Sequence, residues 1–482
     1  MPPLDADAMT ARQKSLAFFT LISALVLEIV DTTIVNTALP SIQHDFAASA
    51  VLLQWVVAGY SLSFAVLLIL GGRLGDLFGY RAMFLLGVGG FTLGSLLCGL
   101  AQDALQLVIA RLVQGAAGAI MAPQVLALMQ VMYAPLERVG KLSWFGVIGG
   151  LSAILGPILG GLLIAANLFG TGWRAVFLIN VPIGALALVA AWYLLPRARS
   201  ARAAGVDAVG TLLMGAGLAA LLLPLVRERD AVWAWWNWAS LALGPLLLLL
   251  GWHYLKRRVA SGRPAVFDPA LFAVATFRQG LLIAVSFSAG MTGFLFLFAY
   301  TLQSVLGYSP LRAGMTHTPF SIGVMIGIGL IGRRLVPRYG RWVLVGGAAI
   351  LAASVGFIML WILGGGAQTV LLVPVLLAAG VGMGMLSGPI PPIAVARIDR
   401  AHAGAASGLL KTSQQLGSAL GVALVGAAYF AASGVVGVPP ILAALALIET
   451  LFVICAIAAV LLPRDVFPKP DGATVDVRVP AV

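Results

Sequence analysis

The stretch LEIVDTTIVNTALP, Leu27 to Pro40, decides the fold class, because it lies in a long apolar run and still contains Glu28 and Asp31 one helical turn apart. A bilayer core needs about 20 apolar residues per helix, and the run from about Ser15 to Ala38 meets that length. Acids at such a depth are costly, so they normally face a cavity or a charged partner. The stretch therefore predicts a membrane helix with a functional polar face.

The whole chain has the composition of a polytopic membrane protein. Its 482 residues are 61% hydrophobic and 10% charged, with a mean hydropathy of +1.04, whereas soluble proteins are about 25% charged. The net charge of +12 is scattered among the short segments between apolar runs, which does not favour a nucleic-acid-binding surface. Cys98 and Cys455 both lie in apolar runs, so neither a disulfide framework nor a cysteine-based metal site is indicated.

Charged residues, Gly and Pro divide the chain into fourteen apolar runs of membrane-spanning length. The first run is longer than the core of a signal peptide, so it is kept as a helix. The runs cover approximately residues 15–38, 50–71, 82–101, 104–131, 142–165, 174–195, 206–226, 238–256, 277–304, 313–335, 341–363, 368–392, 404–430 and 438–462.

The Lys and Arg residues orient these runs, because positively charged loops stay cytoplasmic. With the amino terminus inside, 23 of the 29 basic residues fall in cytoplasmic segments and four in outer ones. The sequence thus predicts an all-α integral membrane protein, multi-pass in the cell membrane, with fourteen transmembrane helices and both termini in the cytoplasm.

The fourteen runs group as six, two and six. The turn after the second run, GGRLGDLFGYR, aligns with the turn after the tenth, GRRLVPRYGRW, and they share Arg-Leu, an aromatic residue and Gly. Weak similarity in matching places is typical of transport proteins built from related halves. We expect an amino-terminal six-helix bundle over 1–196, a linker with two additional helices over 197–263, a carboxy-terminal six-helix bundle over 264–464 and a cytoplasmic tail over 465–482.

The polar residues of the first run fall within one arc of a helical wheel, which includes Glu28, Asp31, Thr32 and Asn36. At 1.5 Å per residue, Asp31 lies about 6 Å below the outer edge of the bilayer core, and Arg111 of the fourth run lies about 10 Å below it. The two side chains are therefore expected to meet. Burial favours a neutral carboxyl group and a nearby arginine favours a carboxylate, so an acid that alternates between such surroundings loads and releases a proton. The alternative is a static ion pair between the two helices.

Three further polar residues lie in apolar runs of the second half of the chain: His317, Lys411 and Glu449. Lys411 is close to the inner end of its run, which favours snorkelling to the interface. Glu449 is in the middle of the last run, and a pair with Lys411 is an alternative. His317 either titrates usefully or is a hydrogen-bonded residue at a helix end. All three are kept as candidate extra polar sites.

The fifth run contains GGLSAILGPILGGLLI, with Gly156 and Gly160 four residues apart and Pro157 and Gly161 beside them. Small residues at this spacing let helices approach closely, and Pro removes one backbone hydrogen bond and permits a bend. Together with the internal repeat, the pattern indicates a helix face that moves.

At several places the sequence resembles the major facilitator superfamily, in the fourteen-helix drug:proton antiporter branch that includes bacterial exporters of quaternary ammonium compounds. WRAVFLINVPIG and LQSVLGYSPLRAG look like this branch, and the resemblance covers nearly the whole chain. The matching motifs are LEIVDTTIVNTALP, GGRLGDLFGYR with Gly72, Asp76, Gly79 and Arg81, ARLVQGAAGA with Arg111, Gln114 and Gly115, and the fifth-run motif with Gly156, Pro157, Gly160 and Gly161.

Taken with the polar arc of the first run, the resemblance implies a role for each group of residues. The proton-coupling group is Asp31, Glu28 and Arg111; the substrate-binding group is Glu28, Asp31, Asn36 and Gln114; the cytoplasmic gate is Gly72, Arg73, Asp76, Gly79 and Arg81; and the closely packed antiport element is Gly156, Pro157, Gly160 and Gly161. For Asp76, a helix-capping or loop-charge role is the alternative.

The sequence also departs from the family pattern. Pro337 stands in the second loop motif at the place of the acid, so a symmetric gate is not expected there. Lys411 and Gln414 stand where the branch usually has Asn and Arg, and His317 is also unusual. Substrate choice is expected to differ at these positions.

The leading functional hypothesis is export of hydrophobic, cationic compounds in exchange for protons, by alternating access. The alternatives are a dedicated exporter of one endogenous metabolite or antibiotic, and a membrane protein without transport activity. The chain has no H-E-x-x-H, G-x-S-x-G or Walker A signature, so we expect no enzyme activity, no cofactor, no metal and no ATP drive. The expected partners are protons, small hydrophobic or cationic substrates and the lipid bilayer, with the monomer as the functional unit.

Overall fold

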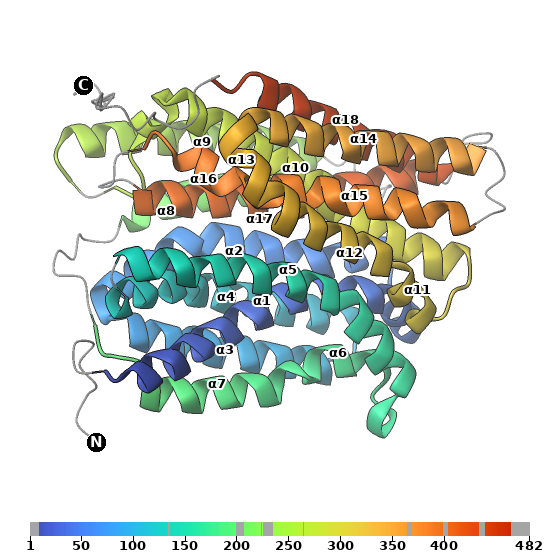
Figure 1. Cartoon of the computed structure of the whole chain (residues 1–482), viewed down its shortest axis with the longest axis horizontal. Helices are drawn as coiled ribbons and strands as arrows, with labels where there is room; N and C mark the ends of the chain where they lie inside the picture. Colours follow the sequence, from blue (N-terminus) through green and yellow to red (C-terminus); the bar gives the residue numbers. More distant parts are fainter. Residues whose placement is uncertain are drawn as a thin grey trace. The chain divides into compact units, whose positions relative to one another are not determined.

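The computed structural model describes residues 9–133, 135–198, 207–222, 224, 235–263, 265–363, 369–398, 403–432 and 439–463. Within these ranges the regular structure is helical and no strand occurs (Figure 1). The chain forms two compact units: one contains Met1–Ala219 and Leu302–Met315, and the other contains Ala220–Thr301 and Thr316–Val482. The expected tail over 465–482 lies outside the described residues.

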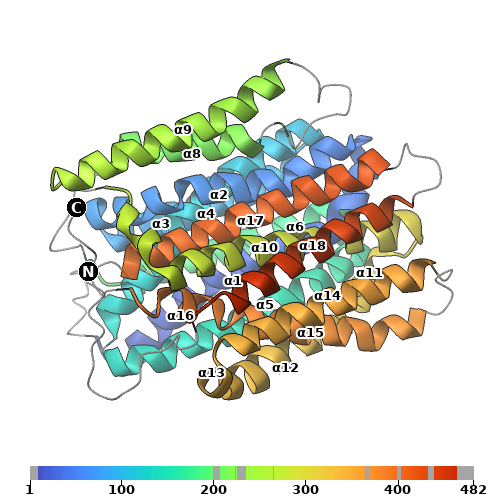
Figure 2. The same ribbon diagram turned by 90° about the horizontal axis from the view of Figure 1, so that it is seen from above.

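The amino-terminal unit is built from long helices that run alongside one another in Figure 1 and Figure 2. Its helices are α1 (Ala11–Phe46), α2 (Ala50–Phe78), α3 (Tyr80–Leu100), α4 (Ala104–Met132), α5 (Pro135–Ala166), α6 (Ala175–Leu178), α7 (Asn180–Leu194), most of α8 (Ala208–Leu222) and most of α11 (Pro310–Thr316).

Local sequence sets where these helices begin. Thr10 and Gln13 form a capping box at α1, in which Thr10 Oγ1 accepts from Gln13 N at 3.3 Å and Gln13 Oε1 accepts from Thr10 N at 2.9 Å. Asp103 caps α4 by accepting from Gln106 N at 2.8 Å. Gly79 alone separates α2 from α3, and its φ of 94° is a left-handed value that glycine adopts without strain.

The second unit contains the remaining helices. They are α9 (Trp235–Ala260), α10 (Ala275–Tyr300), α12 (Thr318–Ile326), α13 (Arg333–Tyr339), α14 (Arg341–Leu363), α15 (Leu372–Ser387), α16 (Ile390–Val395), α17 (Ala403–Ala432) and α18 (Pro440–Val460). The apolar run over 313–335 is not one regular helix, because α11 ends before the proline at the start of α12 and the glycine-rich segment Gly327–Gly332 is π-helical. Such π-helical segments are frequent at functional sites.

The core of the amino-terminal unit lies where α1, α2, α3, α4 and α7 meet. It contains large side chains with almost no exposure, including Leu21, Tyr60, Phe64, Phe84, Phe91 and Met121. Glycine permits the close contact of α3 with α4, since a Cβ at Gly87 would lie 2.7 Å from the backbone of Met121. At the same crossing Gly94 packs against Gln114. The closely packed interface of α3 and α4 therefore contains a predicted site residue.

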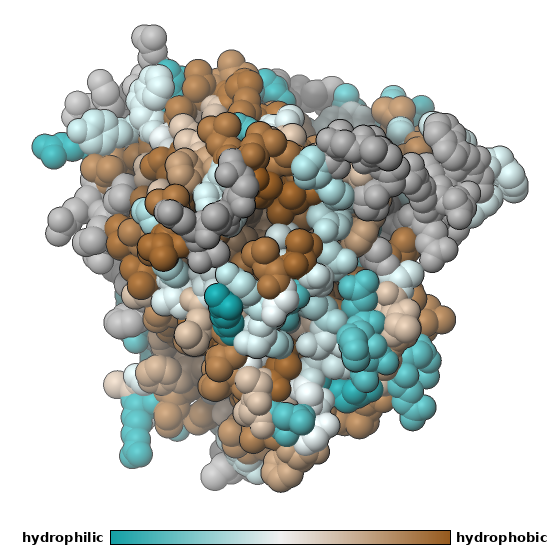
Figure 3. All heavy atoms as spheres, turned by 90° about the vertical axis from the view of Figure 1, so that its right-hand side faces the viewer, coloured by the Kyte–Doolittle hydropathy of each residue, from teal (hydrophilic) through white to brown (hydrophobic). Residues whose placement is uncertain are grey.

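The surface is that of a membrane protein. Eleven helical segments of the described residues are long and apolar enough to cross a bilayer, and shorter apolar helices cover Leu155–Ala166 and Ala208–Leu221. Large apolar side chains are exposed on their outer sides, such as Leu86 (55%) and Leu186 (71%). The face seen in Figure 3 has hydrophilic residues between hydrophobic ones. The chain is thus a multi-pass membrane protein, while the count of fourteen spans and the cytoplasmic position of both termini stay predictions.

The expected domain boundaries also stay predictions. Most of α8 groups with the amino-terminal unit and α9 with the second unit, and the segment Leu302–Met315 groups with the amino-terminal unit although it lies late in the sequence.

Candidate functional site

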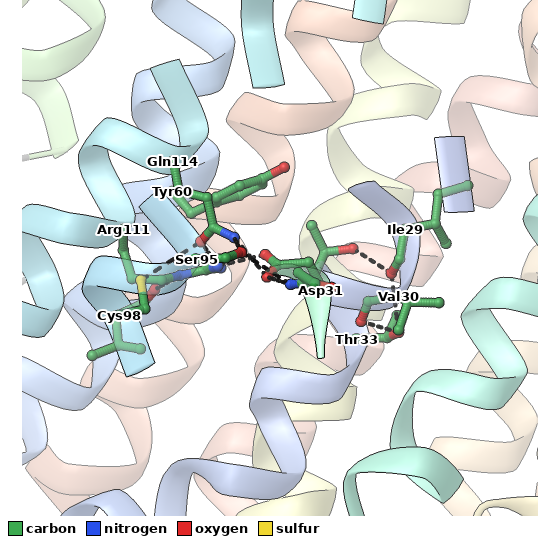
Figure 4. A network of polar contacts seen from close by, with 12 residues as sticks. Ile29, Val30, Asp31, Thr33, Tyr60, Ser95, Cys98, Arg111 and Gln114 are labelled. Atoms are coloured by element: carbon green, nitrogen blue, oxygen red, sulfur yellow. Dashed lines mark hydrogen bonds and ion pairs between the residues drawn. The ribbon is translucent and has the colours of Figure 1, made fainter. Parts of the chain in front are cut away.

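A polar network lies inside the amino-terminal unit, between α1, α3, α4 and α7 (Figure 4). Its members are Asp31 of α1, Ser95 of α3, Arg111 and Gln114 of α4, and Asn180 at the start of α7. Asp31, Ser95, Arg111 and Gln114 have 0% exposure and Asn180 has 2%. Charged groups this deeply buried require close partners.

The Asp31 carboxylate accepts hydrogen bonds from three side chains. Arg111 Nη1 donates to Asp31 Oδ2 at 2.5 Å in an ion pair. Gln114 Nε2 and Asn180 Nδ2 donate to the other oxygen, Oδ1, at 2.8 Å and 3.0 Å. Both carboxylate oxygens are therefore bound, and the acid connects α1 to α4 and α7.

Ser95 and Gln114 hold this arrangement in place from the α3 side. Ser95 Oγ accepts from Gln114 Nε2 at 2.6 Å and from Asn180 Nδ2 at 3.1 Å. Gln114 Oε1 accepts from Arg111 Nη1 at 2.7 Å and from Cys98 Sγ at 3.7 Å. Because each amide bonds at both Asp31 and Ser95, the orientation of the acid depends on several helices at once.

Arg111 is enclosed by backbone and aromatic rings. Its Nε donates to the carbonyl of Val56 at 2.9 Å, and its guanidinium carbon lies 4.4 Å from the ring centre of Tyr60 and 5.8 Å from that of Phe177. Arg111 Nη2 and the Tyr60 hydroxyl have no hydrogen-bond partner among the described residues. The buried guanidinium thus relies on Asp31 for charge compensation and on rings for much of its remaining contact.

Depth along the helices predicts the contact of Asp31 with Arg111, and the structure shows it. Gln114 joins the same network. Glu28 is buried, with 4% exposure, one turn before Asp31 on α1. Asn36 is also buried, but its Nδ2 donates to the backbone oxygen of Thr32 at 3.3 Å.

The residues of the expected gate lie mostly on a helix. Because α2 continues to Phe78, Gly72, Arg73 and Asp76 occupy its last turns, and only Gly79 forms the turn. Asp76 lies 3.8 Å from Arg73 in an ion pair.

The same carboxylate accepts a hydrogen bond from the Tyr80 hydroxyl at 3.0 Å, so Asp76 ties the end of α2 to the start of α3. Arg81 donates to the backbone oxygen of Trp192 at the end of α7, and its guanidinium lies 5.6 Å from the Trp192 ring centre. Within the amino-terminal unit, these contacts fasten the motif to α7. Its role as a gate stays a prediction.

The glycines of α5 are sites of very close packing. A Cβ at Gly156 would collide with the Thr33 side chain, and one at Gly160 would lie 2.9 Å from Ile34 Cγ1 of α1. At a second contact of α5, a Cβ at Gly161 would lie 2.6 Å from the carbonyl oxygen of Pro310, at the start of α11. The expected close packing is therefore present on two sides of α5, with Pro157 inside the helix.

Comparison with known proteins shows the family of the chain. The family model of the Major Facilitator Superfamily matches residues 21–210 and 206–422. The chain belongs to the Major Facilitator Superfamily.

Curated relatives carry the names of an antibiotic transporter and of drug resistance proteins. The chain is 40% identical over 417 residues to a "Probable actinorhodin transporter" of Streptomyces coelicolor, covering 86% of this chain and 72% of the relative. It is 36% identical to a puromycin resistance protein of Streptomyces alboniger, covering 84% and 80%. It is 33% identical to a multidrug resistance protein of Mycobacterium tuberculosis, covering 83% and 73%.

Solved transporter structures share the fold. A D-xylose–proton symporter superposes with a TM-score of 0.67 at 14% identity, over 93% of this chain and 98% of that chain. A bacterial homologue of the human lysosomal transporter Spinster gives 0.64 at 16% identity, over 96% and 100%. At such identities, the likeness establishes the fold alone.

The three extra polar residues of the second unit have different surroundings. His317 is buried, with 3% exposure, and its ring centre lies 4.9 Å from that of Phe298 at an interplanar angle of 82°. Glu449 of α18 faces Gly356 of α14, where a Cβ would lie 3.4 Å from its Oε1. Lys411 is half-buried on α17. The pairing of Lys411 with Glu449 stays a prediction.

Sequence reasoning missed two members of the network, Ser95 and Asn180, and Tyr60, whose ring packs on Arg111. Each is a polar residue in an otherwise apolar run, and Asn180 even lies in the family-like stretch WRAVFLINVPIG. A lone intramembrane Asn or Ser is a usable signal, since a polar group in lipid seeks a partner. Among the described residues no cluster of three or more His, Cys, Asp or Glu side chains is arranged to hold a metal ion.

Proposed function

We propose that this superfamily member exports small hydrophobic compounds, cationic ones among them, in exchange for protons. It does so as an alternating-access monomer with fourteen membrane-spanning helices and cytoplasmic termini. The observation that carries the proposal is the ion pair of Asp31 with Arg111, since both side chains have 0% exposure and Asp31 accepts three hydrogen bonds. Relatives whose names include export, of tetracenomycin C and of cephamycin, support the direction of transport.

In this proposal, protonation of Asp31 changes the contacts of the network. A neutral carboxyl group gives up the ion pair at Oδ2, whereas Arg111 keeps its bonds to Val56 and Gln114 and its contact with the Tyr60 ring. Because Asp31 connects α1 to α4 and α7, loss of its charge loosens α1 from both. A proton thereby changes the packing of the unit, which is the requirement for coupling to a conformational change.

Cargo competes for the same charge. A lipophilic cation entering beside α1 gains about 25 cal/mol per Å² of apolar surface buried, and the carboxylates of Asp31 and Glu28 compensate its charge. Protonation removes that compensation and weakens binding. Proton and cation therefore exclude each other at one site, which gives exchange.

A second candidate is a dedicated exporter of a single antibiotic or metabolite. Relatives named for one compound favour it, such as the "Probable actinorhodin transporter" and a "Tetracenomycin C resistance and export protein" of Streptomyces glaucescens, which is 34% identical. Efflux measured across a panel of lipophilic cations, neutral aromatic antibiotics and anions separates the two, because a dedicated exporter responds to one compound class.

The decisive experiment removes the charge of Asp31 while it keeps the size of the side chain and one acceptor oxygen. Inverted membrane vesicles with the full chain are energised with a proton gradient, and uptake of a lipophilic cation such as ethidium is recorded. We expect Asp31→Asn to abolish gradient-driven uptake. The matched control is Asp45→Asn on the same helix, whose carboxylate is 45% exposed and pairs with Arg174 at 2.9 Å; it should transport at the wild-type rate.

Two results contradict the proposal. One is wild-type transport by Asp31→Asn, and the other is transport that continues after the proton gradient is collapsed. Size-exclusion profiles of both variants check that a lost signal reflects coupling and not loss of folded protein.

A further inference from the structure

A cavity of about 440 Å³ lies in the amino-terminal unit, where the α2–α3 turn meets the segment that follows α7. The chemistry of this cavity differs from that of the buried network, because its lining is basic and aromatic. The lining residues are Phe78, Gly79, Arg81, Ala82, Leu85, Trp192, Arg197 and Ala198. No acidic side chain is among them.

Arg81 and Arg197 both line this cavity, and a hydrogen bond joins the segments that contain them. Tyr80 N donates to the carbonyl oxygen of Ala198 at 3.0 Å, which fastens the start of α3 to the segment after α7. Arg81 donates to the backbone of Trp192 through Nη2. A guanidinium has five N–H donors, so most of those on Arg81 are not used by this bond, and Arg197 beside it is exposed.

Neighbouring residues neutralise little of the positive charge of the cavity. The nearest acid along the chain, Asp76, already accepts from the Tyr80 hydroxyl at 3.0 Å and pairs with Arg73 at 3.8 Å. The cavity is also lined by Gly79 and Ala82 at the amino end of α3, where no side chain caps the helix. The helix dipole adds to the attraction for an anion at such an end.

The cavity adjoins an apolar surface that is open to lipid. Phe78 is 57% exposed and Trp192 is 59% exposed, although both line the cavity. On the two helices that follow the cavity, Leu86 of α3 and Val189 of α7 are 55% and 58% exposed. Basic groups next to exposed apolar side chains fit an amphiphile, with an anionic head and hydrocarbon tails, better than a free anion, which would use only the basic part.

We propose that this cavity binds the headgroup of an anionic phospholipid of the phosphatidylglycerol type. The phosphodiester accepts hydrogen bonds from Arg81 and Arg197, and the acyl chains lie along Phe78 and the exposed side of α3 and α7. The residues belong to the predicted cytoplasmic side, where clustered Lys and Arg attract anionic lipid. The lipid thus joins the α2–α3 turn to the end of α7, the same elements that Arg81 connects.

Native mass spectrometry of the purified full chain tests this binding without any transport measurement. Detergent-solubilised protein is titrated with phosphatidylglycerol or phosphatidylcholine of identical acyl chains. We expect the wild type to retain phosphatidylglycerol preferentially and Arg197→Gln to weaken its binding about fivefold, the ratio that corresponds to about 1 kcal/mol per basic residue. Arg197→Lys should keep most of the affinity.

The matched control is Arg12→Gln, which removes one exposed positive charge from the start of α1 outside the cavity, and it should bind as the wild type does. Equal retention of phosphatidylglycerol by Arg197→Gln and wild type overturns the proposal, as does equal binding of the two lipids by the wild type. Displacement of bound lipid by soluble glycerol phosphate at matched concentration also overturns it, because the site then recognises a free anion.

Discussion

The two units bury different chemistry. The amino-terminal unit buries a charged pair, Asp31 with Arg111, at 2.5 Å and 0% exposure. In the second unit, rings pack around the buried His317: Phe298 lies 4.9 Å from it, and Phe294 stacks on Phe298 at 5.5 Å with planes 15° apart. Another ring cluster joins α10 to α17, where Tyr300 lies 5.5 Å from Tyr429 and 5.7 Å from Phe430.

The difference suggests a division of work within the proposed transporter. A buried ion pair changes its energy sharply when one partner is neutralised, so it suits a switch. Aromatic clusters offer large apolar surfaces and weak directional preferences, which suit recognition of varied hydrophobic cargo. We therefore expect substitutions in the charged network to abolish coupling, and substitutions among the rings to alter cargo preference.

The largest effect is expected from Arg111→Met, which leaves Asp31 buried without a compensating charge. Removing one partner of a buried pair costs about 3–5 kcal/mol, so the variant should unfold at a markedly lower temperature and lose proton-driven transport. The control is Arg174→Met, since Arg174 pairs with Asp45 at 2.9 Å with side chains 30% and 45% exposed. Exposed pairs contribute about 1 kcal/mol or less.

Thermal unfolding in detergent and vesicle transport, measured on both variants, check this ranking. Equal losses of stability for Arg111→Met and Arg174→Met would show that burial does not make the Asp31–Arg111 pair more important to stability than the exposed Asp45–Arg174 pair.

A smaller effect is expected from Asn180→Leu, which removes one donor from Asp31 and one from Ser95. A hydrogen bond to a charged group contributes about 1.5–3 kcal/mol. Because Gln114 and Arg111 still donate to Asp31, we expect the transport rate to fall by about tenfold, at the low end of that range. Cys98→Ala is the control, because its thiol makes only a weak contact of 3.7 Å with Gln114. Wild-type transport by Asn180→Leu would show that Arg111 and Gln114 alone position the acid.

Much of the fold follows from one-dimensional information in the sequence. Apolar runs and their lengths identify the helical membrane protein, and residue counts along a helix give the depth at which Asp31 and Arg111 meet. The rotation of each helix about its own axis cannot be predicted in this way, because it depends on which neighbours pack against the helix. Asn180 and Ser95 therefore enter the site only when α7 and α3 are seen beside α1.

Helix ends are harder to predict than apolar runs, because they also depend on backbone hydrogen bonding and local packing. Apolarity falls at Gly72, which suggests a turn there, but backbone hydrogen bonding continues α2 to Phe78 because the polar residues beyond the bilayer remain good helix formers. Gly79, with its positive φ, is where the helix stops. The breaks around Gly327–Gly332 reflect local packing and glycine content, which hydropathy does not report.

The smallest effect is expected from His317→Phe, and it addresses whether the second unit also takes part in proton coupling. An edge-to-face ring contact contributes about 0.5–1.5 kcal/mol, and a phenyl ring at 317 retains that contact with Phe298 while removing the titratable nitrogens. If the residue acts by shape, the pH dependence of transport stays as in the wild type and only the relative rates for aromatic and aliphatic cargo change. Phe298→Leu, which keeps His317 and removes the ring that it packs on, should change the same cargo ratio. A shift of the pH profile in His317→Phe that Phe298→Leu does not reproduce would place a proton-binding group in the second unit, and the contrast between a charged switch and an aromatic surface would then no longer separate the two units.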